Sequence, residues 1–173
     1  MIDSKTLVQL KAFARQDGAI LAVVWLASMW CMFKWSGSTW GPLLMLSTPF
    51  FVAWRLKSFR DGALEGVISF RRAFAYSCYV FFYASLLFAL GQYLYFRFLD
   101  NGAFMTVVNQ SLETLKPIYL QNGIKEKELT TAMELMKNMK PSEWVFTFMT
   151  NNLFIGAFVS PVIALIGKRN IKR

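Results

Sequence analysis

The sequence contains no histidine and only two cysteines among its 173 residues. Without histidine, a Ser/His/Asp triad and a Cys/His metal site are excluded. The two cysteines, Cys31 and Cys78, lie inside apolar runs, where a thiol behaves as a small apolar side chain. The chain also shows no strand pattern and no glycine-rich phosphate loop. We therefore expect no enzymatic activity, no metal and no cofactor.

Charged residues make up only 17% of the chain and are missing from long stretches of it. The hydrophobic fraction is 55% and the mean hydropathy is +0.38, values too apolar for a soluble domain of this length. Four apolar blocks contain no acid, so no carboxylate is expected within the membrane. Because roughly 20 apolar residues cross a hydrocarbon core, the blocks predict four transmembrane helices. The predicted spans are 18–35, 39–54, 73–99 and 144–166.

The first two blocks are shorter than the others, so a shallow or re-entrant hairpin is the alternative to two full spans. Their tryptophans, Trp35 and Trp54 among them, favour full spans because indole rings mark the headgroup level. Pro49 is expected to kink the second span. The sequence thus predicts one all-α membrane domain over residues 1–173.

Basic residues are unevenly distributed between the two sides of this arrangement. Twelve bases and four acids lie on the side with both termini and the strip between spans two and three, whereas the other side is nearly neutral. The positive-inside rule places that basic side in the cytoplasm, and it makes the strip a topology marker rather than a nucleic-acid contact. Bases beside a membrane also attract anionic headgroups. The candidate lipid-headgroup contacts are Arg55, Lys57, Arg60, Arg71 and Arg72.

The segment 100–142, between the third and fourth spans, is the only sizeable part outside the membrane, and we expect it on the periplasmic side. Apolar residues at steps of three or four predict two short amphipathic helices, which end near Gly123 and Pro141. Met133, Met136 and Met139 resemble a thioether site for Cu(I), but the same spacing is that of an apolar helical face, which is the simpler interpretation.

Small and polar residues recur inside the predicted spans. A stripe with a period of four in the fourth span predicts a helix-packing face, made of Asn152, Gly156, Ser160 and Ala164. The candidate intramembrane polar contacts are Gln92, Asn151 and Asn152. An amide in hydrocarbon needs a partner, so these three are expected to face protein, or else to line a polar cavity.

Several runs resemble the bacterial membrane family known as domain of unknown function 4199. These runs are GVISFRRAF, YLYFRFLDNGAF, NGIKEKELTTAMELMKNMKP and NNLFIGAFVSPVIALIGKR. The resemblance covers roughly residues 18–170 and implies a four-span protein of the bacterial inner membrane, with no activity assigned. It also implies that a membrane glycosyltransferase is a possible partner.

Two functional classes are consistent with these patterns. The first is a non-enzymatic scaffold or accessory subunit of a membrane complex, which contacts another membrane protein or a second copy of itself. The second is a translocator or binder of a lipid or lipid-linked substrate, for which the basic strip and the amides would hold the headgroup. Amides enclosed by helices would favour the first class. An open polar groove that reaches the basic strip would favour the second.

Overall fold

The computed structural model describes residues 4–35 and 39–169, which form seven α-helices. The helices are α1 (Ser4–Lys34), α2 (Trp40–Leu46), α3 (Thr48–Ala63), α4 (Phe70–Phe98), α5 (Ala103–Gln121), α6 (Glu126–Asn138) and α7 (Pro141–Gly167). Within the described residues, the β contacts are limited to one antiparallel bridge between Ile68 and Arg169. The prediction of an all-helical fold is confirmed.

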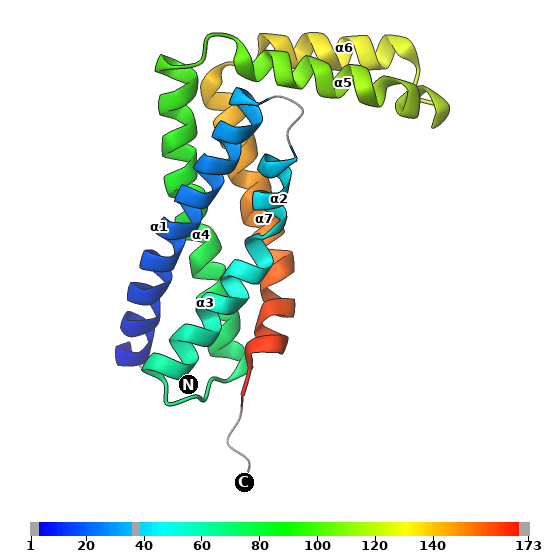
Figure 1. The fold of residues 1–173 in the computed structure, drawn as a ribbon. Coiled ribbons are helices and arrows are strands. Elements are labelled where there is room, and N and C mark those ends of the chain that lie inside the picture. Colours follow the sequence, from blue (N-terminus) through cyan, green and yellow to red (C-terminus); the bar gives the residue numbers. More distant parts are fainter. Residues whose placement is uncertain (1–3, 36–38, 170–173) are drawn as a thin grey trace.

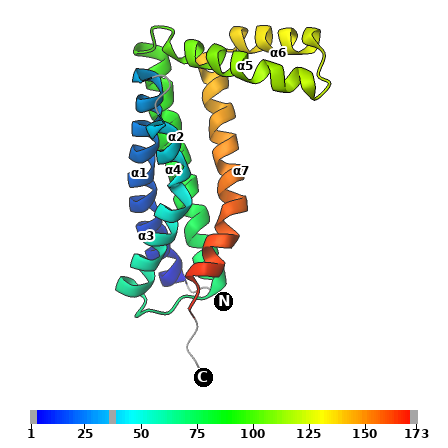
Figure 2. The same cartoon turned by 45° about the vertical axis from the view of Figure 1, so that its right-hand side comes forward.

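The bundle is built around α4, which packs along both α1 and α7. Helices α2 and α3 follow one another along α1, and α3 also touches α7. Helices α5 and α6 form a hairpin that lies across one end of the bundle and projects beyond it (Figures 1 and 2). The two ends of the chain lie at the opposite end of the bundle (Figure 1).

Three helices are long and apolar enough to cross a membrane, namely α1 over Leu7–Lys34, α4 and α7. The predicted span 39–54 is not one continuous helix, because α2 ends at Leu46 and α3 begins at Thr48. The break falls just before Pro49, whose ring removes a backbone N–H. Neither piece alone has the length of a span, and α3 runs on to Ala63 through the first part of the basic strip.

Helix α1 begins well before the predicted boundary at Gly18 and carries Asp17 in its middle. The candidate span over Leu7–Lys34 therefore begins earlier than the predicted span and includes a carboxylate. The sequence pattern placed Asp17 outside because polar residues precede it. Contacts from α3 and α4 allow the helix to bury it.

The break between α2 and α3 is fixed to α1 by two buried hydrogen bonds. The Ser28 hydroxyl donates to the Gly41 carbonyl oxygen over 2.7 Å, and Trp25 Nε1 donates to Thr48 Oγ1 over 2.9 Å. Both bonds use polar groups that would be costly to leave unpaired in a buried site. They explain why the broken helix stays against α1.

The segment 100–142 forms the two expected helices. Helix α5 continues through Pro117 and ends at Gln121, and Gly123 then adopts the left-handed region with φ of 85°. Glycine occupies this region without steric cost, so it suits the turn into α6. Phe104, near the start of α5, is buried against Phe33, Phe96 and Trp144 and joins the hairpin to the bundle.

Candidate functional site

A buried carboxylate, Asp17, is the meeting point of three helices. Arg55 of α3 donates from Nε to Asp17 Oδ1 over 2.6 Å and also contacts this oxygen through Nη2. The Tyr76 hydroxyl of α4 donates to Oδ2. Because Asp17 is only 1% exposed, its charge depends on these partners for compensation. Arg55, predicted as a headgroup contact, thus binds inside the protein.

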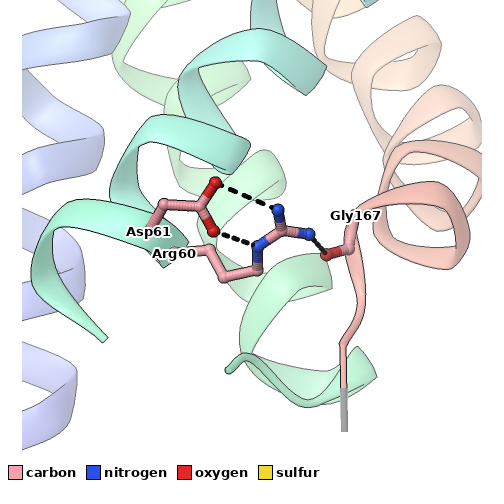
Figure 3. Close-up of polar contacts among 3 residues, drawn as sticks. All are labelled: Arg60, Asp61 and Gly167. Atoms are coloured by element: carbon pink, nitrogen blue, oxygen red, sulfur yellow. Dashed lines mark hydrogen bonds and ion pairs between the residues drawn. The ribbon is translucent and has the colours of Figure 1, made fainter. Parts of the chain in front are cut away.

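Arg60 makes a second internal contact at the end of the bundle that carries both termini (Figure 3). Its Nε and Nη2 donate to the Asp61 carboxylate over 2.7 and 3.1 Å, and its Nη1 donates to the Gly167 carbonyl oxygen over 3.0 Å. Gly167 is the last residue of α7, where carbonyl oxygens lack helical partners and carry partial negative charge. Arg60 therefore holds the end of α7 against α3.

The basic strip is accordingly split between internal and exposed residues. Arg55 and Arg60 bind other parts of the chain, whereas Lys57 and Arg71 are exposed and Arg72 is half-buried. The proposed headgroup contacts remain predictions, and the exposed pair is best placed to make them.

The small-residue stripe of α7 lies on the side of the helix that faces α4. Gly156, Ser160 and Ala164 are buried and Asn152 is half-buried. A Cβ added to Gly156 would lie 2.6 Å from both Cβ and Cγ of Phe81. No side chain fits at that distance, so the close approach of α7 and α4 depends on the glycine.

The three candidate amides lie in different surroundings. Gln92 of α4 is buried, Asn152 is half-buried and Asn151 is exposed. Gln92 and Asn152 line the same cavity, of about 440 Å³, beneath the hairpin. The structure thus brings two of the amides together and leaves the third on the outer surface of α7.

This cavity, named the inner cavity below, is walled mainly by apolar and aromatic side chains from α1, α4, α5 and α7. The aromatic residues in its wall are Trp25, Phe33, Phe88, Phe96, Phe104, Trp144 and Phe148. None of the five candidate headgroup residues lines it. A cavity of this size and composition is typical of sites for apolar small molecules.

The three methionines of the second amphipathic helix are half-buried, and Met136 lines the inner cavity. No cluster of three His, Cys, Asp or Glu side chains suited to a metal is found among the residues that the structure describes. Within the hairpin, Lys116 Nζ donates to Glu126 Oε1 over 2.8 Å, which lowers the pKa of Glu126 below its ordinary value. This exposed pair links α5 to α6.

Asp17 and Phe104 are important residues that the sequence patterns did not identify. A signal for Asp17 was present, because Leu10, Ala14 and Leu21 are buried at helical spacing and Asp17 continues their stripe. Phe104 was recognised only as part of an apolar stripe. Its role at the junction of four helices depends on how those helices meet.

Comparison with known proteins adds the family. No match is found among the curated proteins or among the solved structures. One family model, described as a protein of unknown function (DUF4199), matches residues 16–169. Because this match spans the bundle and the hairpin together, the chain belongs to the DUF4199 family of membrane proteins.

Proposed function

We propose that this protein is a non-enzymatic accessory subunit of a membrane complex, and that the α5–α6 hairpin contacts the partner. The observation that carries the proposal is the position of the hairpin, which lies across the end of the bundle and projects to one side of it (Figure 2). Apolar side chains along it remain exposed. They include Leu115, Ile118, Leu120, Ile124 and Leu135.

The charge of the hairpin favours a protein partner over an anionic lipid surface. Residues 103–138 contain four lysines and four glutamates, so the segment has no net charge. Helices that lie on anionic membranes are typically rich in lysine and arginine. A neutral surface with exposed apolar residues is better suited to another protein, and a membrane glycosyltransferase is the partner class that the family resemblance suggests.

The polar groups of the bundle favour the accessory role over translocation. Asp17, Arg55 and Arg60 are bound within the chain, and Gln92 is enclosed. The inner cavity that holds the amides lies at the hairpin end, whereas the exposed bases lie toward the other end. This arrangement offers no support for a polar path between them.

The proposed topology has four crossings, with α2 and α3 together as the second. Contacts between this pair and α1 advance in antiparallel order. They join Gly41 to Ser28, Thr48 to Trp25, Arg55 to Asp17 and Phe59 to Phe13. A helical path from Trp40 to Ala63 covers about 36 Å, enough for the hydrocarbon core. The positive-inside rule puts the basic end of the bundle on the cytoplasmic side of a bacterial inner membrane, and the hairpin then lies on the periplasmic side.

The accessory role is tested by photo-crosslinking in native membranes. A photoreactive amino acid at Leu135 or Ile118, both exposed on the hairpin, should give the same protein adduct. The matched position Phe158, exposed on the membrane face of α7, should give lipid adducts instead. The substitution Leu135→Glu should abolish the adduct at Ile118. Hairpin adducts with lipid alone would contradict the proposal.

A further inference from the structure

The amide of Gln92 is enclosed in the bundle with its oxygen unpaired. Gln92 is 3% exposed, and its Oε1 accepts no hydrogen bond from any residue that the structure describes. A buried acceptor without a donor destabilises the structure, because the group has lost its hydrogen bonds to water without replacement. Gln92 lines the inner cavity, and because the terminal amide torsion of glutamine is broad, the oxygen can turn toward a donor in that cavity.

The inner cavity continues toward the edge of the bundle. A second hollow of about 690 Å³, named the outer hollow, lies between α2 and α5 and shares Met32, Val107 and Ser111 with the inner cavity. Its outer edge includes Leu43 and Leu46, which are exposed. The two hollows therefore adjoin, and an elongated molecule could extend from Gln92 to the surface between α2 and α5.

The lining residues define the chemistry of such a molecule. No charged side chain is among the described residues that line either hollow, so an ionic headgroup would lack a counter-charge. Pro42, Leu46 and Leu115 of the outer hollow offer apolar surface for a hydrocarbon chain. The unpaired oxygen of Gln92 requires an O–H or N–H donor.

We propose that the inner cavity and the outer hollow bind a neutral single-chain amphiphile from the membrane, whose hydroxyl or amide N–H donates to Gln92 Oε1. The donor group sits in the inner cavity and the hydrocarbon chain runs through the outer hollow toward Leu43. Binding at this site is independent of the accessory role and of any protein partner.

Ordered water is the competing source of a donor. A buried water typically makes about three hydrogen bonds. The hydroxyls of Ser28 and Ser111 in the cavity wall already donate to the carbonyl oxygens of Gly41 and Val107, which leaves only Asn152 beside Gln92 as a polar side chain for a water. The site is better suited to a ligand with one polar group and a long apolar part.

The test uses two probes that differ in whether a hydroxyl hydrogen or a methyl group is bound to the same oxygen. The full chain in neutral phosphatidylcholine nanodiscs is irradiated with a fatty alcohol that carries a diazirine on its chain, or with the methyl ether of that alcohol. We expect alcohol adducts on α5 and on residues 40–46, and binding of the ether weaker by about fivefold, the effect of one neutral hydrogen bond. Gln92→Leu should remove the difference between the probes.

Asn151→Leu is the matched control, because it also replaces an amide by leucine but lies on the exposed side of α7. It should preserve the preference for the alcohol. Val108→Trp, which fills the inner cavity, should abolish the adducts of both probes. This variant tests whether the probes bind in the cavity if Gln92→Leu does not fold. Equal labelling of wild type by alcohol and ether would overturn the proposal and leave water as the donor. Adducts confined to lipid-facing residues would overturn it as well.

Discussion

At the scale of single residues, the buried polar side chains decide how α1, α3 and α4 meet. Asp17 and Arg55 are far apart in sequence, yet Arg55 Nε lies 2.6 Å from Asp17 Oδ1, and Tyr76 closes the other side of the carboxylate. A buried pair of this kind adds little net stability, but removal of one partner is expensive because it leaves the other charge uncompensated.

We therefore predict that Arg55→Met lowers the free energy of unfolding by about 3 kcal/mol. This is the low end of the range for broken buried pairs, because the Arg55 side chain is 23% exposed. The double variant Asp17→Asn with Arg55→Met should recover part of the loss, since no buried charge remains. Unfolding in a denaturing-detergent titration measures both.

Lys57→Met, which removes an exposed base from the same helix, is the control and should change stability little. If Arg55→Met were as mild as Lys57→Met, Asp17 would not depend on Arg55 for its charge.

At the scale of helices, α7 is held against α4 by close packing, and the hairpin is held by an aromatic cluster. The first contact requires small residues because the two backbones approach closely at Phe81. The contact of the hairpin requires a large side chain, because Phe104 fills the space between α1, α4 and α7.

Gly156→Leu is predicted to destabilise the protein by about 1 to 3 kcal/mol through overpacking. The new side chain would meet Phe81 Cβ, which is fixed to the backbone of α4 and cannot rotate away. Phe158→Leu and Val162→Leu, on the exposed face of α7, should be nearly silent. Thermal stability in detergent compares the three variants. An unchanged stability of Gly156→Leu would show that α7 can move away from α4 without cost.

Phe104→Ala is predicted to loosen the hairpin while the bundle stays folded. Loss of a buried phenylalanine typically costs about 3 kcal/mol, and Phe104 is only 8% exposed. Hydrogen exchange across α5 and α6 should accelerate strongly, with little change in α4. Phe98→Ala, at the exposed end of α4, is the control. Equal protection of the hairpin from hydrogen exchange in both variants would mean that contacts other than those of Phe104 hold the hairpin to the bundle.

At the scale of the whole molecule, the number of crossings depends on the broken helix α2–α3. With four crossings the N- and C-termini lie on the same side of the membrane, whereas three crossings by α1, α4 and α7 would place them on opposite sides. The hairpin lies opposite the C-terminus in both cases, so the termini are the discriminating pair.

Reporter fusions at the two termini are predicted to report the same, cytoplasmic side, and a fusion at residue 120 the opposite side. The physical reason is the concentration of bases at the end of the bundle that carries both termini. Opposite reports from the termini would show that α2–α3 does not cross.

The sequence by itself determined the helical class, the long helices α4 and α7 and the two helices between them, because these depend on local hydropathy and on a period of 3.6 residues. The stripe at Gly156 was also readable, since its period is that of one helix face. The sequence did not show which residue of another helix contacts each buried polar side chain. Asp17 resembled a polar residue that precedes a span. Gln92 was recognised as an amide in an apolar helix, but its surroundings were not.

Only the tertiary structure paired Asp17 with Arg55 and Tyr76, divided the basic strip into internal and exposed residues, and placed Gln92 in a cavity beneath the hairpin. These features join residues from helices far apart in the chain. A periodic pattern states which face of a helix is apolar, but it does not state which helix covers that face. That choice depends on packing between helices, and it is where the candidate sites of this protein arise.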